Sequence, residues 1–237
     1  MLSSGAETYR VEDTMLRILQ KCKFDDVETF ATSTGIFATA SAKDGNIVTM
    51  VKRVKSRSNN FHKIAIANKV SRDFVNEEIN IIEAVDKLIE TKNMKAYPPW
   101  IRIFGAALAA LCFAAMLGGG FDDGINAFVA ASLMQIPVLF LEYKNIAAVL
   151  RNICGGALAA LFSLILLNIG LGTSINAIII GTIMPLVPGL SLTNAIRDIL
   201  EGDFLSGSAR ILDAILIAIS IATGVGVVMN LWYSTLT

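Results

Sequence analysis

The residues Tyr97-Pro98-Pro99-Trp100, followed by the run 101–120 (IRIFGAALAALCFAAMLGGG), divide the sequence into two parts of different composition. Residues 1–100 contain 15 Lys and Arg and 13 Asp and Glu, whereas residues 101–237 contain only 5 and 7. The first part has the composition of a soluble protein, and the second is as poor in charge as a membrane protein. This contrast excludes a single soluble globule, a disordered chain and a nucleic-acid-binding protein that relies on net positive charge.

The first part of the sequence predicts a small α+β domain. Apolar residues at helical spacing predict one amphipathic helix from about Thr8 to Lys23. Alternating apolar residues then predict three short strands, and Lys43-Asp44-Gly45-Asn46 contains the Asp-Gly hairpin signal. Two helices follow, and Ser58-Asn59-Asn60 supplies a cap for the first of them. The predicted strands are 27–32, 36–41 and 47–51, and the predicted order is α-β-β-β-α-α.

The sequence contains no recognisable catalytic or cofactor-binding motif. His62 is the single histidine, and although Ser58 lies four positions before it, no carboxylate is placed to orient the pair. Neither a phosphate-binding loop nor a G-x-S-x-G turn is present. We therefore expect no enzyme activity, no cofactor and no metal site. The basic run 52–57 lacks interleaved aromatic residues, which favours a solvated face in contact with anionic lipid over binding of nucleic acid.

The second part of the sequence contains five apolar runs, each of which predicts a transmembrane helix. A spanning helix needs roughly 20 residues, so the second and fourth runs must include flanking residues. The runs are 101–120, 125–141, 146–169, 174–190 and 211–232. The sequence thus predicts a polytopic α-helical membrane protein with five transmembrane helices (residues 99–237), preceded by a small cytoplasmic α+β domain (residues 1–98).

The positive charges of the second part predict the orientation of these helices. Segments 118–124, 168–174 and 233–237 contain no Lys or Arg, and no cleavable signal peptide is visible at the N-terminus. Cationic residues are enriched in cytoplasmic loops, so we expect the N-terminus inside and Thr237 outside. The five cationic residues that define the inside are Arg102, Lys144, Arg151, Arg197 and Arg210.

Small residues recur at every fourth position along the first and the fifth apolar run. Such stripes allow two helix backbones to approach closely within a membrane. We therefore expect each stripe to contact another helix, either of this chain or of a second chain. The stripes are Ala106, Ala110, Ala114 and Gly118, and Ala214, Ala218, Ala222 and Gly226.

The segment 181–198 (GTIMPLVPGLSLTNAIRD) predicts a helix that is broken and then restarts. Its two prolines lack backbone donors, and Ser191 or Thr193 is expected to cap a new helix that runs to about Leu200. The free amides at such a helix start suit a carboxylate of a small metabolite. We assign substrate binding or gating to Pro185, Pro188, Gly189, Ser191, Thr193 and Asn194. The alternative is that the Pro-Gly pair only ends the fourth span at the cytoplasmic surface.

Carboxylates in or near the apolar runs are candidates for an ion or proton pathway, because ionisable groups at membrane depth are costly. Asp198 lies one turn into the new helix, and Asp213 lies one turn into the fifth run. Arg197 cannot face the adjacent Asp198 on a helix, so we expect Arg197 to pair elsewhere or with anionic lipid.

Taken together, these features resemble the threonine/serine exporter family. The resemblance rests on 185–189 (PLVPG), 193–198 (TNAIRD), Gly202-Asp203, Ser206-Gly207, 60–64 (NFHKI) and 118–123 (GGGFDD). Asp123 is similar to the acidic position that follows a Gly-rich turn in this family, and it joins Asp198 and Asp213 as a candidate for ion or proton coupling. Full-length members are about twice as long, so the chain resembles their N-terminal half, of YjjP type.

The resemblance implies one subunit of a secondary exporter in the bacterial inner (plasma) membrane. Its partner would be a YjjB-type membrane protein of four or five spans, a further copy of the chain, or both. Split pairs of this kind imply export of small carboxylates such as succinate, whereas fused members export threonine and serine. No nucleotide-binding motif is present, so an ion gradient or substrate outflow would supply the energy. The alternative function is a non-transporting, membrane-anchored sensor or assembly subunit.

Overall fold

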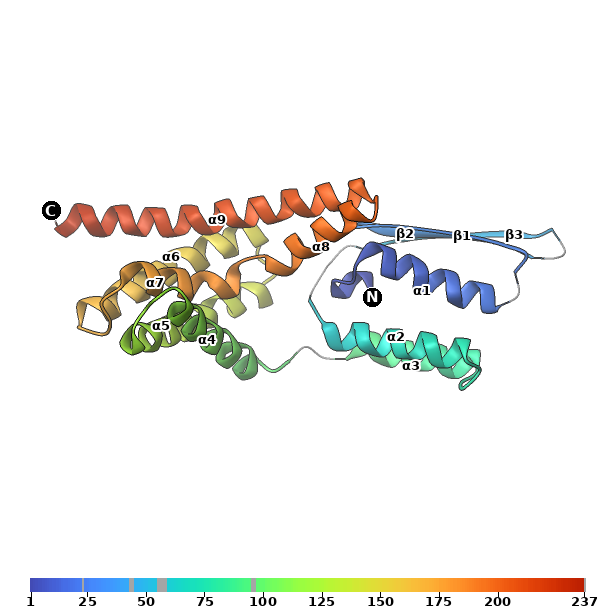
Figure 1. Cartoon of the computed structure of the whole chain (residues 1–237), viewed down its shortest axis with the longest axis horizontal. Helices are drawn as coiled ribbons and strands as arrows, with labels where there is room; N and C mark the ends of the chain where they lie inside the picture. Colours follow the sequence, from blue (N-terminus) through green and yellow to red (C-terminus); the bar gives the residue numbers. More distant parts are fainter. Residues whose placement is uncertain (23, 43–44, 55–58, 95–96, 237) are drawn as a thin grey trace. The chain divides into compact units, whose positions relative to one another are not determined.

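The computed structural model describes residues 1–22, 24–42, 45–54, 59–94 and 97–236, which form two compact units (Figure 1). Unit 1 is formed by Met1–Ala96 together with Leu190–Leu212, and unit 2 by Tyr97–Gly189 together with Asp213–Thr237. The predictions made for Lys23, Lys43, Asp44, residues 55–58 and Thr237 lie outside the described residues. The structure is mostly helical and contains one small sheet.

Unit 1 contains an antiparallel sheet of three strands in the order β1-β2-β3, joined by short turns. Helix α1 packs on β1, and α2 packs against both α1 and α3. The predicted order α-β-β-β-α-α is confirmed, with a short helix η1 (Leu2–Ser4) added in front. The elements are α1 (Thr8–Lys21), β1 (Asp26–Thr32), β2 (Gly35–Ser41), β3 (Ile47–Arg53), α2 (Phe61–Val75) and α3 (Ile81–Asn93).

Local sequence signals account for the turns and helix starts of unit 1. Gly45 adopts a positive φ of 82° between β2 and β3, a conformation that a residue without Cβ adopts easily. The side chain of Asn60 accepts a hydrogen bond from the Lys63 amide and thereby caps α2. His62 is exposed in the first turn of that helix. The core beneath these elements consists of Leu2, Ala6, Val11, Ala31 and Ile64.

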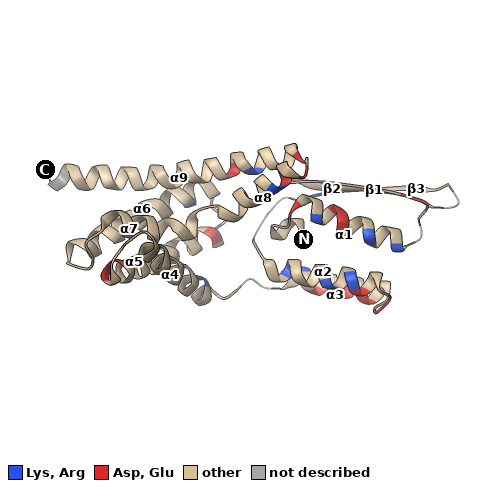
Figure 2. Ribbon diagram, viewed as in Figure 1, with Lys and Arg blue, Asp and Glu red and all other residues tan. Residues whose placement is uncertain are grey.

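Unit 2 contains the apolar helices. Four helices of the described residues are long and apolar enough to cross a membrane, and there are five if the broken pair Ile175–Leu200 counts as one span. Figure 2 shows that charged residues are frequent on α1, α2 and α3 and sparse on the helices of unit 2. The four helices are α4 (Pro99–Met116), α5 (Phe121–Tyr143), α6 (Ala148–Asn168) and α9 (Phe204–Leu236).

The core of unit 2 is rich in alanine, so its helices approach closely. Two members of the first small-residue stripe pack as predicted: Ala110 and Ala114 are fully buried, and a Cβ on Gly181 of α7 (Ile175–Ile183) would lie 2.8 Å from the Ala110 carbonyl oxygen. Gly118, the last member, lies beyond the end of α4 and is exposed. Close backbone approach is the main means by which helices associate in lipid. The buried residues of this core are Ala110, Ala114, Ala127, Ala131, Met134, Val138 and Ala159.

The second stripe makes little contact within this chain, so its predicted contact with a helix of a second chain remains a prediction. On α9, Ala214 is buried, but Ala218, Ala222 and Gly226 are exposed in this chain. The contact with α6 is made instead by the neighbouring face, where Cβ atoms on Gly156 and Gly224 would collide with backbone atoms of the opposite helix. Glycines permit a closer approach than alanines, and this difference places the Gly224 face rather than the alanine face against α6.

Candidate functional site

The predicted break in the fourth apolar run is present. Helix α7 is followed by the short helix η2 (Met184–Leu186), and Val187 and Pro188 are not helical before α8 (Gly189–Leu200) begins. The predicted cap is wrong, because α8 starts directly after Pro188 and Ser191 and Thr193 therefore lie inside the helix. Pro188 has a fixed φ and no amide hydrogen, which suits it to the position just before a helix.

The predicted gating residues have different environments. Pro185 lies within η2 and Pro188 in the break, and both are half-buried. Thr193 is exposed on α8, whereas Asn194 is only 5% exposed. The buried polar face of α8 therefore begins at Asn194 rather than at the predicted caps.

Three polar side chains on one face of α8 contact the segment that precedes α1. Asn194, Arg197 and Asp198 stand at positions i, i+3 and i+4, which share a helix face. The amide of Asn194 donates to the Gly5 carbonyl at 2.9 Å, and Arg197 forms an ion pair with Glu7. Arg197 thus pairs away from its neighbour Asp198, as its position on the helix predicted.

Asp198 lies at the centre of this contact and is only 1% exposed. Its carboxylate is 2.9 Å from Nε of Arg210 and accepts a hydrogen bond from the Thr8 amide at 3.3 Å. Thr8 is the first residue of α1, whose own cap residue Glu7 makes no side-chain cap. Asp198 therefore caps α1 from a distant part of the chain, a position that the helix dipole favours for an anion.

Arg210 completes the contact from the first turns of α9. Its guanidinium donates to the Ala6 carbonyl at 3.0 Å, and its side chain is 7% exposed. The hydroxyl of Ser206, also on α9, accepts from the Ser33 amide at 2.9 Å. The arrangement neutralises both buried charges and fixes α8 and the start of α9 to the N-terminal elements of unit 1. From the sequence, Arg210 is expected only to mark the cytoplasmic side, and its contact with Asp198 was not predicted.

Asp123 and Asp213 lie in unit 2, whereas Asp198 lies in unit 1. Asp123 is 1% exposed, and its carboxylate accepts from the amides of Gly120 (2.8 Å), Thr173 (2.6 Å) and Ser174 (2.9 Å). These bonds connect the start of α5 to the start of α7. Asp213 is exposed on α9. The three carboxylates proposed for coupling therefore have three different environments.

A second set of buried polar side chains in unit 2 was not predicted. Asn126 on α5, Ser163 on α6 and Thr182 on α7 are 0%, 2% and 0% exposed. Ser163 and Thr182 are joined by a hydrogen bond of 3.2 Å between their hydroxyls, and Asn126 contacts the Ser163 carbonyl. The sequence feature that could have predicted this set is Asn126, a polar amide at the second position of the apolar run 125–141. We call these three residues the α5–α7 polar cluster.

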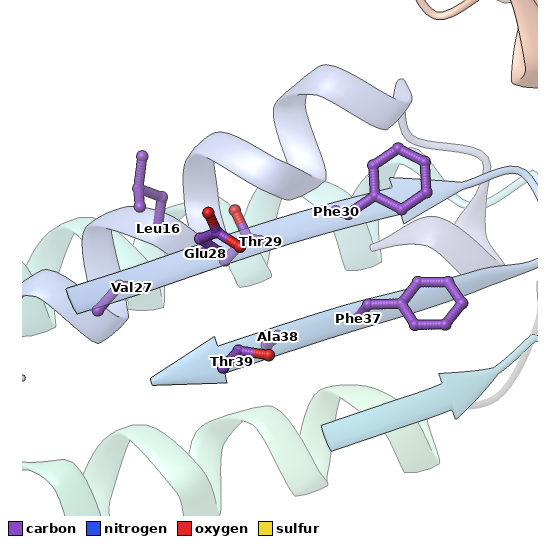
Figure 3. Close-up of a pocket in the computed structure, with 8 residues that line it drawn as sticks. All are labelled: Leu16, Val27, Glu28, Thr29, Phe30, Phe37, Ala38 and Thr39. Carbon is purple, nitrogen blue, oxygen red and sulfur yellow. The ribbon is translucent and has the colours of Figure 1, made fainter. Parts of the chain in front are cut away.

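A hollow of about 430 Å³ lies in unit 1 where α1 meets β1 and β2 (Figure 3). The Phe30 and Phe37 rings lie at one end of it, with their centroids 5.9 Å apart, and Glu28 is its one charged lining residue. Thr29 and Thr39 add hydroxyl groups to the lining, so the hollow presents polar as well as apolar surface to a small molecule. Its lining residues are Leu16, Val27, Glu28, Thr29, Phe30, Phe37, Ala38 and Thr39.

Comparison with known proteins identifies the family. The sequence profile described as "Putative threonine/serine exporter" (ThrE) matches residues 1–232. The chain belongs to this family. The predicted resemblance is therefore confirmed over nearly the whole sequence, and the apolar helices of unit 2 are those of a multi-pass membrane protein from an exporter family.

Three relatives in the threonine/serine exporter family show what this chain is similar to. Proteins named "Probable succinate transporter subunit YjjP" from Klebsiella aerogenes and Escherichia coli (strain K12) are 24% and 26% identical, and each alignment covers 98% of this chain and 90% of the relative. A "Probable threonine/serine exporter" from Mycobacterium tuberculosis is 28% identical, over 57% of this chain and 26% of that protein. No solved structure matches the chain.

Proposed function

We propose that this chain is a membrane subunit of a secondary exporter for small metabolites, either threonine/serine-type amino acids or dicarboxylates such as succinate. The observation that carries the proposal is the set of buried polar side chains between the apolar helices of unit 2: Asp123, Asn126, Ser163 and Thr182. Polar groups at membrane depth are costly and mark substrate or ion pathways, whereas a simple anchor needs none. Membership of an exporter family supports the same conclusion.

The proposed partner is a second small membrane protein of YjjB type, with four or five spans, or a further copy of this chain. Two relatives that cover 98% of the chain are named as transporter subunits, which supports a divided transporter. The exposed face of α9 that carries Ala218 and Ala222 is suited to close contact with another helix. Secondary transporters commonly bind their substrate between two structural repeats. In this proposal the chain and its partner each supply one repeat, and an ion gradient would drive export.

The proposed orientation in the bacterial inner membrane places the N-terminus in the cytoplasm and the C-terminus outside. Arg102 lies at the start of α4, Lys144 directly after α5, and Arg151 at the start of α6. In alternating spans these three positions share one side, and cationic residues favour the cytoplasmic side. Arg102 also forms an ion pair of 2.8 Å with Glu142, which joins the same ends of α4 and α5.

The segment from Pro185 to Asp198 remains our proposal for a gate. The non-helical break at Val187 and Pro188 supports it, because a broken helix exposes backbone groups that can contact a substrate. Asn194 and Asp198 bind backbone groups of residues 5–8 in unit 1, which supports a role for these two side chains in fixing α8 in its position. Ion or proton coupling is proposed for Asp123, Asp198 and Asp213.

The second candidate function is a non-transporting, membrane-anchored sensor or assembly subunit. The hollow between α1 and the sheet favours this candidate, because it could receive a small ligand within unit 1. Under this function the apolar helices would only anchor the chain, and no metabolite would cross the membrane through them.

Efflux from intact cells distinguishes the two functions. Cells that lack related exporters are loaded with threonine, serine or succinate and express the chain alone, the partner alone, or both. We expect accelerated efflux of at least one of these compounds when both proteins are present, and already with the chain alone if its partner is a further copy of the chain. Efflux that stays at the level of cells without either protein, with both proteins shown to be in the membrane, would favour the sensor.

A further inference from the structure

The α5–α7 polar cluster has a hydrogen-bond pattern that can be assigned atom by atom. Thr182 Oγ1 donates its single proton to the Ile178 carbonyl at 2.8 Å. The hydrogen bond between Ser163 Oγ and Thr182 Oγ1 must therefore use the proton of Ser163. Neither hydroxyl has a proton left for a further partner.

Asn126 uses both of its protons in the same way. Its Nδ2 group donates to the Ser163 carbonyl at 3.3 Å and to the Leu171 carbonyl at 2.7 Å. These two carbonyls fix the orientation of the amide, because Oδ1 in place of Nδ2 would face two acceptors. Asn126 Oδ1 is fully buried and has no hydrogen-bond partner among the described residues. Helix packing explains the bonds that the cluster makes, but it leaves this buried acceptor unexplained.

The cluster thus offers acceptors and no donors, and no cationic side chain of unit 2 is near it. Within the described part of unit 2 the cationic residues are Arg102, Lys144 and Arg151, at the opposite ends of their helices. Along α6, Arg151 is about 18 Å from Ser163 at the rise of an α-helix, and Lys144 is about 27 Å along the direction of α5 from Asn126. A carboxylate would find neither a hydrogen-bond donor nor a positive charge among the side chains of this cluster.

We infer that the α5–α7 polar cluster binds a monovalent cationic group, with Asn126 Oδ1 and Ser163 Oγ as its ligands. Oxygen atoms are the ligands that hard cations prefer, and the same acceptors can bind an ammonium group. Two sources supply such a group: the ammonium of an amino-acid substrate, or a sodium ion that drives transport. The identity of the ligand rests on the proposed function, because a transporter needs a substrate or a driving ion. The binding itself can be measured without transport.

The test is thermal unfolding of the purified full-length chain in detergent, in a buffer based on choline chloride. Sodium chloride is added in one series, L-threonine or L-serine without sodium in a second, and choline succinate in a third. We expect one of the first two series to raise the unfolding temperature with saturation, and succinate to leave it unchanged. Saturation by sodium identifies an ion as the ligand, and saturation by the amino acid identifies the ammonium group.

Two variants and a matched control assign that response to the cluster. Ser163→Ala removes one ligand and should weaken the apparent affinity by about tenfold, the size expected for one lost contact to a charged group. Asn126→Leu removes the Oδ1 ligand, together with the two hydrogen bonds that Nδ2 donates, and should abolish the saturable response. Ser220→Ala is the control, because Ser220 is a buried hydroxyl of α9 whose proton bonds the Leu216 carbonyl of its own helix.

The inference would be overturned if neither sodium nor the amino acids stabilised the wild-type chain, or if succinate stabilised it equally. An equal response of wild type and Ser163→Ala would also overturn it. If the cluster binds the cation but the chain moves no metabolite, this inference is supported and the proposed function is refuted.

Discussion

Asp198 and Arg210 are paired charges that are almost fully removed from water, and each also bonds the backbone of residues 6–8. A charge in such a position is tolerated only while its partner is present, since its hydration has been lost. The pair therefore links α8, the start of α9 and the start of α1, and we call it the Asp198–Arg210 clasp. Its removal should lower the stability of all of unit 1.

Replacing Asp198 by Asn should destabilise the chain strongly, because Arg210 would be left buried and unpaired. We expect a loss of about 3–5 kcal/mol for the single variant, and recovery of most of it when Arg210→Met is combined with Asp198→Leu. The measurement is thermal unfolding of the purified chain in detergent. Asp13→Asn is the control: its exposed pair with Arg17 is worth about 0.5 kcal/mol or less. Equal unfolding temperatures for Asp198→Asn and Asp13→Asn would refute the clasp.

Asp123 and its neighbour Asp122 provide a second matched pair of carboxylates. Asp122 is exposed, whereas Asp123 bonds three amides that lead into α5 and α7. If Asp123 is structural, Asp123→Asn should lower thermal stability by about 1–3 kcal/mol, the range for weakened hydrogen bonds to a charged group, while Asp122→Asn leaves it unchanged. If Asp123 instead carries the coupling ion, the Asn variant would keep its stability and lose efflux.

Single residues show where sequence reasoning succeeds and where it fails. Helix geometry alone predicts that Arg197 does not pair with the adjacent Asp198, and the structure confirms this. The partners Glu7, Thr8 and Arg210 could not be read, because they are distant in sequence and no local pattern connects them. Ser191 and Thr193 are good capping residues, but Pro188 starts the helix earlier and so excludes them from the cap.

At the scale of elements, α6 and α9 pack through glycines that have no side chain to separate the backbones. A Cβ on Gly224 would collide with the Ile153 carbonyl oxygen and lie 2.7 Å from the Ala157 amide nitrogen. Gly226 stands two positions further along the same helix, with nothing within 4 Å of its Cβ position. The two glycines have the same intrinsic helix propensity, but Gly224 is packed against α6 whereas Gly226 has open space around it.

Gly224→Ala should destabilise unit 2 by about 1–3 kcal/mol, because the added methyl group must push α6 and α9 apart. Gly226→Ala should be neutral or stabilise the chain by up to about 1 kcal/mol, since alanine is the better helix former. Thermal unfolding of the two variants under the same detergent conditions measures the difference. Similar unfolding temperatures for both would show that α9 does not pack on α6 through Gly224.

Element boundaries were largely predictable, and their associations were not. The strands and the helices of residues 8–93 followed from alternation, helical spacing and turn residues, and the helix after Pro188 ends at Leu200 as expected. The membership of residues 190–212 in unit 1 was not foreseen, because the composition assigned all of residues 99–237 to the transmembrane domain. The contact that decides this membership is made by polar residues, and hydropathy does not detect it.

At the scale of the whole molecule, the one-sided distribution of cationic residues predicts the orientation of the chain. A fluorescent protein that matures only in the cytoplasm should remain dark when fused after Thr237, and an alkaline phosphatase at the same place should be active. The fluorescent protein fused at the N-terminus is the control and should be bright. A bright C-terminal fusion would place both ends inside and exclude an odd number of spans.

We propose that the chain moves a small metabolite across a membrane together with a second subunit. The most direct measurement is efflux from liposomes that contain the purified chain, the purified partner, or both, loaded with radiolabelled threonine or succinate and subjected to an imposed ion gradient. We expect at least one compound to leave the liposomes faster when both proteins are present than with either protein alone. Efflux at the rate of protein-free liposomes, with both proteins folded and assembled in the bilayer, would contradict it.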